Sequence, residues 1–175
     1  MSGPPVLETE RLLLREHRPE DLDAYHAMWC DPEVVRYVNS GGGALSREQA
    51  WDAILRHRGM WAIFGFGFWV IEDKGTGRLI GEVGMQERCR NIQPEIRGTL
   101  EAGWVLSPEW HGRGLAREAM GAVIDWCDER FPAKPFTCII NPANERSLKL
   151  AEKLGFRILA RTSYRDTPNL LLQRG

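Results

Sequence analysis

The sequence predicts a single α/β domain in which helices cover a layered β-sheet. In the second half of the chain, β-rich runs and helical patterns follow one another in the order strand, helix, strand, helix, strand, which is typical of layered α/β folds. The length of 175 residues suits one domain with a substantial core. No internal repeat and no linker marks a second domain, so the expected domain spans residues 1–175.

Local signals define the elements of the first half. Proline followed by two acidic residues at 19–21 is typical of a helix start. Ser46 and Gln49 have the spacing of a capping box, which predicts that another helix begins there. The glycine-rich segment 39–43 is the clearest predicted hinge. We expect a strand over 12–16, a helix from 19 toward 31, a turn over 32–38 and a helix after Ser46.

The second half begins with two β runs, 66–72 and 79–86, around a glycine-containing loop that predicts a hairpin. A polar connection follows over 88–98. The helix that begins near residue 115 has its apolar residues on one stripe, which predicts a core-facing side; they are Leu115, Ala119, Met120, Val123, Ile124 and Cys127. Further strands are expected over 99–106, 136–140, 156–164 and 169–174, and a helix from Asn144.

Composition excludes several classes of protein. The formal net charge is −1, so the bulk composition has no nucleic-acid footprint. The four cysteines form no C-x-x-C pair and the four histidines are scattered, which argues against a structural zinc site and fits reduced thiols in the cytoplasm. We expect no signal peptide, membrane span or metal. A local basic cluster is expected to be a solvated helix face; it comprises Arg47, Arg56, His57 and Arg58.

The segment after the strand at 99–106 has the composition of a phosphate-binding turn. A proline-marked turn leads to glycines at 112 and 114 directly before a helix, and helix N-termini present free N–H groups and a positive dipole end. The P-loop is excluded because the chain has no Gly-Lys pair. The dinucleotide fingerprint is excluded because Arg117 stands where its third glycine is required.

The motif His111-x-x-Gly114-x-Ala116 resembles the Q/R-x-x-G-x-G/A motif of the GCN5-related N-acetyltransferase (GNAT) superfamily. The run 144–156 is similar to the N-x-x-S-x-x-x-x-x-K-L-G-F segment of its RimJ/RimL-like branch, and segments 9–15 and 77–81 resemble that branch as well. The matches keep the family order along nearly the whole chain. The resemblance implies a mixed, mostly antiparallel, twisted central sheet that is splayed at an acyl-CoA site and flanked by helices.

The resemblance also implies acetyl-CoA as co-substrate, without a metal. Backbone N–H groups of the glycine loop would hold the pyrophosphate, and the preceding strand, splayed or bulged, would pair with the pantetheine arm and supply an oxyanion donor. His111 stands where Gln or Arg is usual, so it is either a phosphate donor or a solvated loop residue. The predicted coenzyme-binding residues are Trp104, Val105, Leu106, His111, Gly112, Arg113, Gly114, Leu115, Ala116 and the helix-capping Asn144.

Transfer to an amine needs a proton acceptor and a group that protonates the thiolate. Glu101 lies on a central strand, where burial raises the pKa of a carboxylate as suits a general base. The alternative role of Glu101 is structural, at the strand surface or in an ion pair with Arg97. Glu82, on the neighbouring strand, is the second candidate for the general base. The resemblance places Ser147 near the CoA thiol as general acid, because Ala151 stands where many relatives have tyrosine. The alternative is an ordinary serine in a first helical turn.

The sequence therefore predicts an acetyl-CoA-dependent N-acetyltransferase. Transfer is expected to be direct, because no base accompanies Cys138 for an acyl-cysteine intermediate. The branch favours a protein N-terminal α-amine as acceptor; the alternatives are a polyamine, antibiotic or amino acid, or a non-catalytic acyl-CoA sensor. Trp29 or Trp51 is expected in the acceptor wall. The branch and the seven tryptophans are compatible with a homodimer.

Overall fold

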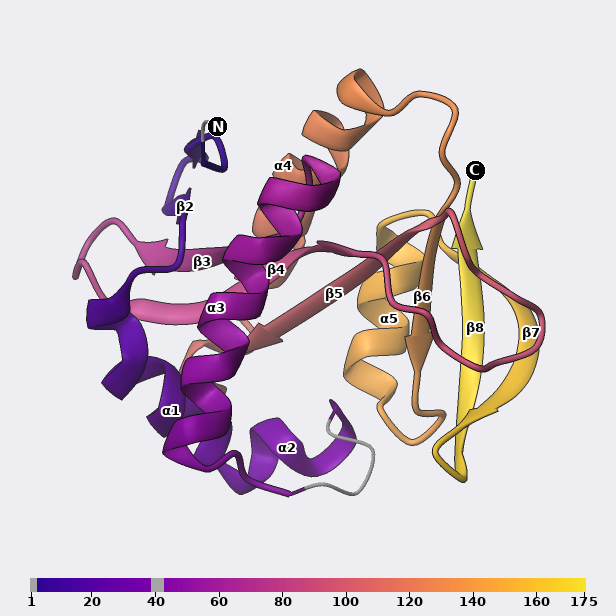
Figure 1. The fold of residues 1–175 in the computed structure, drawn as a ribbon, viewed down its shortest axis with the longest axis horizontal. Helices are drawn as coiled ribbons and strands as arrows, with labels where there is room; N and C mark the ends of the chain where they lie inside the picture. Colours follow the sequence, from indigo (N-terminus) through magenta and orange to yellow (C-terminus); the bar gives the residue numbers. More distant parts are fainter. Residues whose placement is uncertain (1–2, 39–42) are drawn as a thin grey trace.

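The computed structural model describes residues 3–38 and 43–175, which form one eight-stranded sheet and five α-helices (Figure 1). The predicted hinge at 39–43 lies outside these ranges except for Gly43. The helices are α1 (Leu22–Cys30), α2 (Pro32–Val38), α3 (Arg47–Phe64), α4 (Leu115–Arg130) and α5 (Glu145–Lys153). The strands are β1 (Leu7–Glu8), β2 (Leu12–Arg15), β3 (Phe68–Asp73), β4 (Leu79–Gln86), β5 (Leu100–Leu106), β6 (Phe136–Ile140), β7 (Arg157–Tyr164) and β8 (Thr167–Arg174).

The sheet has the order β1-β2-β3-β4-β5-β6-β8-β7, and every neighbouring pair is antiparallel except β5 with β6. This parallel pair is short, because only Leu100 and Glu101 are in register with Phe136 and Thr137. Beyond Glu101 the two strands separate. The expected α/β class, with a mixed, mostly antiparallel and locally splayed sheet, is therefore confirmed.

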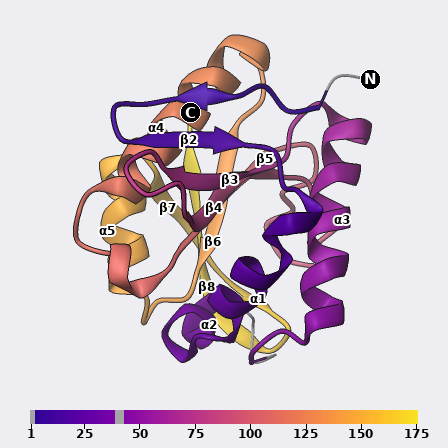
Figure 2. The ribbon, with the colours of Figure 1, turned by 90° about the vertical axis from the view of Figure 1, so that its left-hand side faces the viewer.

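Helices cover both faces of the sheet, with α1, α2 and α3 on one side and α4 and α5 on the other (Figure 2). The predicted apolar stripe of α4 is buried against the sheet in the main core. A second cluster joins α1, α2 and α3 and reaches Leu79 and Val105. A third anchors the connection between β4 and β5, because Ile92 and Ile96 pack on Leu171 of β8.

Several boundaries differ from the expected ones for local reasons. The segment 32–38 is a helix rather than a turn, because the Asp31 side chain accepts the N–H of Glu33 and the Asp31 carbonyl accepts the next two N–H groups. Residues 19–21 form a 3-10 turn before α1. Gly65, with φ of 72°, ends α3 in the left-handed conformation and delays β3 to residue 68. The capping box at Ser46 is confirmed.

Other differences concern strand pairing. The strand expected over 12–16 ends at Arg15 and pairs with β1, which was not expected. The strand expected from residue 169 begins two residues earlier, since Arg165 and Asp166 have positive φ and close a tight hairpin. No helix within 3–38 or 43–175 has both the length and the apolar character needed to cross a membrane.

Candidate active site

A cavity of about 200 Å³ lies where β5 and β6 separate, and residues from both sides of the sheet line it. Trp104, Asn144 and Ser147 contribute from the side of α4 and α5. His57 and Glu82 contribute from the side of α3, together with Glu101. Two reactants can therefore reach the cavity from opposite faces. Of the two tryptophans expected in the acceptor wall, Trp29 lines the cavity and Trp51 does not.

The glycine loop before α4 is shaped by its glycines. Gly112 and Gly114 have φ of 75° and 77°, a conformation that favours glycine, and Gly114 is the N-cap of α4. The first N–H groups of α4 have no acceptor within the helix and are free for an anion. The Arg11 side chain stabilises the loop, because it donates hydrogen bonds to the carbonyl of Arg113 at 2.9 Å and to the carboxylate of Glu118 at 2.7 Å. The loop is thus held in a form suited to phosphate.

His111 connects the same loop to the end of β5 and to α5. Its Nε2–H donates to the carbonyl of Leu106 at 2.9 Å, and its Nδ1 accepts from Arg146 at 3.0 Å. Both ring nitrogens are engaged, so the contacts give His111 a positioning role. Arg113 extends over the ring of Trp110, with 4.9 Å from the guanidinium carbon to the ring centroid.

The end of β5 offers an open backbone edge toward β6. Its register with β4 runs without interruption from Gln86 opposite Glu101 to Gly81 opposite Leu106, so the strand is splayed from β6 and not bulged. Beyond the short parallel pair, the other edge of β5, at Trp104 and Val105 for example, pairs with no strand of residues 3–38 or 43–175. Such an edge can pair with the amides of an extended ligand.

The side chain of Trp104 has a further contact, with Ser147. Its indole N–H donates to the Ser147 Oγ at 3.2 Å. The backbone N–H of Ser147 donates to the Asn144 side chain, also at 3.2 Å, which confirms Asn144 as the N-cap of α5. The Ser147 hydroxyl hydrogen has no acceptor among the described residues, so it is available to a ligand in the cavity.

Glu101 is buried, and its carboxylate is held by two neighbours. It accepts from the Gln86 side chain at 3.0 Å and from Arg90 at 2.8–3.0 Å. The expected partner was wrong, because Arg97 pairs with Glu95 at the surface instead. Burial acts to lower the pKa of Arg90, but the bond to Glu101 outweighs it and leaves that pKa raised.

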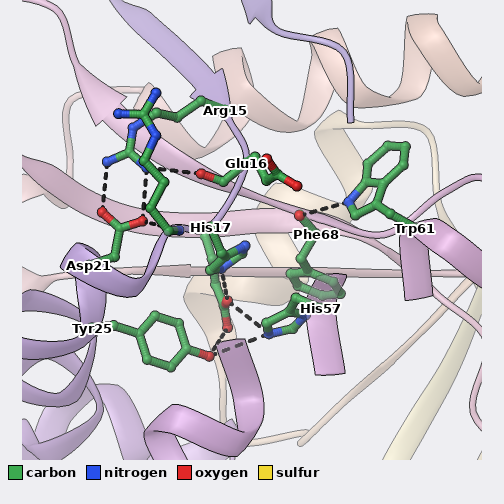
Figure 3. A network of polar contacts seen from close by, with 10 residues as sticks. Arg15, Glu16, His17, Asp21, Tyr25, His57, Trp61 and Phe68 are labelled. Atoms are coloured by element: carbon green, nitrogen blue, oxygen red, sulfur yellow. Dashed lines mark hydrogen bonds and ion pairs between the residues drawn. The ribbon is translucent and has the colours of Figure 1, made fainter. Parts of the chain in front are cut away.

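Glu82 lies at the centre of a buried network that the sequence did not predict. Figure 3 labels three of its members, His17, Tyr25 and His57. The Glu82 carboxylate is 3.2 Å from the Nε2 atoms of both His17 and His57 and accepts from the Tyr25 hydroxyl at 3.2 Å. Burial alone would raise the pKa of Glu82, but these contacts hold it well below its usual range. Burial lowers the pKa of His57.

The expectation that His57 is solvated was wrong, since it is 3% exposed. A periodic signal was present: His57 shares the inner stripe of α3 with Ala50, Ala53, Ile54 and Met60. The grouping with His17 had no such local signal, because the two lie on separate elements.

His17, His57 and Glu82 are also spaced so that they could hold a metal ion, with ligand atoms within 4.8 Å of one another. The two imidazole rings, however, stack 4.7 Å apart with 19° between their planes. A metal ion lies near the plane of each imidazole that binds it, and two stacked, nearly parallel planes do not meet nearby. Hydrogen bonds to Glu82 therefore account for this cluster better than coordination does.

Comparisons with known proteins agree with this arrangement. Residues 11–157 match the family model described as an acetyltransferase (GNAT) domain. An uncharacterised N-acetyltransferase of Bacillus licheniformis, p20, is 30% identical over 152 residues, which cover 87% of this chain and 82% of p20.

Solved structures share the fold. A protein of Bordetella pertussis assigned to the GnaT acetyltransferase family has a TM-score of 0.84 and 32% identity, covering 98% of this chain and 100% of that one. The RimL ribosomal L7/L12 α-N-protein acetyltransferase in complex with coenzyme A has a TM-score of 0.79 over 97% of each chain, at 12% identity. The chain therefore belongs to the GNAT acetyltransferase family and is an N-acetyltransferase.

Proposed function

We propose that this enzyme transfers the acetyl group of acetyl-CoA directly to the α-amine of a protein or peptide N-terminus. The observation that carries the proposal is the cavity at the splay, which joins Ser147 on one side of the sheet to Glu101 on the other. A thioester held along β5 and an amine entering from the side of α3 would meet there. This geometry favours an enzyme over a sensor that only binds acyl-CoA.

Acetyl-CoA is the co-substrate of the family. In this chain the N–H groups of residues 112–116 would hold its pyrophosphate. The open edge of β5 over residues 104–106 would bind the pantetheine amides, with Asn144 nearby. His111 would fix the position of the glycine loop relative to the end of β5, through its hydrogen bond to the Leu106 carbonyl.

Direct transfer is supported by Cys138, the cysteine on the cavity wall. Burial, followed by the charge of Glu101, raises the pKa of its thiol. The thiol therefore stays protonated at neutral pH, and a protonated thiol is a poor nucleophile for an acyl-enzyme.

Glu101 would accept the amine proton through a water molecule, and the Ser147 hydroxyl would protonate the leaving thiolate. Glu82 is less suited to be the base, because its pKa is lowered and both of its oxygens accept hydrogen bonds. A protein α-amine has a pKa of about 7.7–8.0, so roughly a tenth of it is already neutral at pH 7. Deprotonating lysine at that pH costs about 4.6 kcal/mol. Glu101 is already ion-paired and is therefore a weak base, which is sufficient for an α-amine but not for a lysine side chain.

The acceptor class has two further supports. The RimL protein named above is, by its name, an α-N-protein acetyltransferase, and it shares this fold. Four arginines and two glutamates are the charged groups of the described residues that line the cavity, so a polycationic polyamine or aminoglycoside would be repelled.

The test is release of the CoA thiol from acetyl-CoA with peptides whose α-amine or lysine is separately blocked, and with polyamines. We expect turnover with a free α-amine and none when only lysine is free. Turnover with polyamines and not with peptides would overturn the proposed acceptor. The same panel with Ser147→Ala tests whether the cavity is the site of reaction.

A further inference from the structure

Both acidic residues of the cavity wall have partners, but three of its four arginines have no acidic partner among the described residues. Glu101 is neutralised by Arg90, and Glu82 is bound by His17, His57 and Tyr25. The other cationic residues on the wall are Arg56 of α3, Arg88 of the segment after β4, and Arg165 at the tip of the β7–β8 hairpin. The guanidinium groups of these three form no ion pair and no hydrogen bond with residues 3–38 or 43–175. The acceptor side of the cavity therefore has an excess of positive charge.

Arg88 is the most informative of the three, because it is only partly exposed. Burial lowers the pKa of Arg88, and the charges of Arg56 and Arg90 lower it further. Partly buried charges normally have a partner, since leaving water without one is costly. An arginine held beside two other guanidinium groups, without a carboxylate of its own, is better explained by an anion that binds there.

The tip of the β7–β8 hairpin forms part of the cavity wall near Arg88. The Arg90 guanidinium lies over the Tyr164 ring, with 4.4 Å to the ring centroid, and Arg165 flanks the same ring at 5.3 Å. Ile92 and Ile96 hold the connecting segment against β8 nearby, with Tyr164 packed against them. The orientation of this part of the wall is thus fixed by packing.

These arginines are distinct from the phosphate-binding loop. None of residues 111–116 lines the cavity, whereas Arg56, Arg88 and Arg165 do. The coenzyme pyrophosphate is therefore not the anion that they would bind. Glu82 and His57 share the wall with them, on the side of α3 from which the amine would enter.

We infer that the acceptor carries a carboxylate close to its reacting amine, and that Arg88, with Arg56 and Arg165, binds this carboxylate. The inference rests on the proposed function and narrows its substrate class. The planar fork of a guanidinium group matches a carboxylate and can bind it with two hydrogen bonds. Near an α-amine, that group is either an acidic side chain at the first positions of a peptide or the α-carboxylate of a free amino acid.

The experiment measures CoA release with matched acceptors that differ only in this charge. The peptides begin with Asp or Asn at the first position, and the small acceptors are glutamine and its α-amide; each pair is compared at equal concentrations of the unprotonated amine. We expect the charged member of one pair to have a kcat/KM about tenfold to a hundredfold higher, which is the range for a hydrogen bond to a charged group. The pair that responds identifies whether the carboxylate comes from a peptide or an amino acid.

Variants connect the preference to the cavity. Arg88→Gln should remove the preference for the charged acceptor, because kcat/KM should fall about tenfold to a hundredfold for the charged acceptor and much less for the neutral one. Arg97→Gln is the matched control, because Arg97 belongs to the same connecting segment but is exposed and outside the cavity. It should leave both acceptors unchanged. Raising the salt concentration should weaken the preference in the wild type and not in Arg88→Gln.

Equal kcat/KM for charged and neutral acceptors, or an equal loss of both in Arg88→Gln, would overturn the inference while leaving α-amine acetylation intact. If no α-amine turns over, the proposed function fails, and the inference is then decided by binding. Calorimetry with the N-acetylated forms of both acceptor pairs should still give tighter binding for the charged member of one pair, with the difference lost in Arg88→Gln. The absence of a difference in both pairs would overturn the inference.

Discussion

Replacing Glu101 by glutamine separates a catalytic role from a structural one. Glu101 and Arg90 form an ion pair whose side chains are only 4% and 8% exposed. Removing one partner of a buried pair costs about 3–5 kcal/mol, because the remaining charge is left without compensation. Glutamine keeps one acceptor oxygen, so we expect the lower end, about 3 kcal/mol. For a chain of this length, that corresponds to a melting temperature lower by roughly 6–12 °C.

A second substitution restores the charge balance. In Glu101→Gln/Arg90→Met neither charge remains, so most of the lost stability should return. If Glu101 is the general base, kcat should fall by about 10²–10⁴-fold in both Glu101→Gln and the double variant. Arg90→Met alone keeps the carboxylate, so its kcat should stay within about tenfold of the wild type, well short of a lost base.

The assay is CoA release at 25 °C with a peptide of neutral first residue, so that the loss of positive charge at Arg90 does not affect acceptor binding. Thermal unfolding of the same samples gives the stability. Recovery of both kcat and melting temperature in the double variant would refute the general-base role. Glu101 would then serve only to hold Arg90 in the cavity wall.

Three further predictions concern the sheet, the leaving group and pH. In Gly84→Ala the new Cβ would collide with the backbone carbonyl oxygen of Gly67, so urea unfolding should show a loss of about 3 kcal/mol in stability. Gly59→Ala in α3, with open space around it, should instead gain about 0.5–1 kcal/mol. Ser147→Ala should lower kcat about 100-fold without changing the KM for acetyl-CoA, and an unchanged kcat would exclude the proton-donor role. Burial alone would raise the pKa of Asp21, but the hydrogen bonds from Arg15 outweigh it and lower that pKa below 3.8. The ionised Asp21 therefore stabilises the fold above pH 3.8, and this stabilisation is lost as the pH falls through the lowered pKa. In Asp21→Asn the free energy of unfolding should depend less on pH in this range.

The sequence by itself determined what is encoded over a few neighbouring residues. The capping box of Ser46 with Gln49 and the cap of Asn144 on Ser147 each join positions three apart, and both are present. The stripe of α4 repeats at helical spacing and is buried. The glycines before α4 were recognisable because the turn requires positive φ. The fold class and the shape of the glycine loop follow from such local signals.

Only the tertiary structure decided how the cavity wall around Glu82 and Glu101 is built. Glu82 binds His17 across 65 residues, and Glu101 pairs with Arg90 rather than Arg97. The segment that carries both arginines has no periodicity, and its course depends on where its isoleucines pack against β8. Side-chain partners of this kind are chosen by packing and burial among distant elements, and local sequence patterns do not encode that choice.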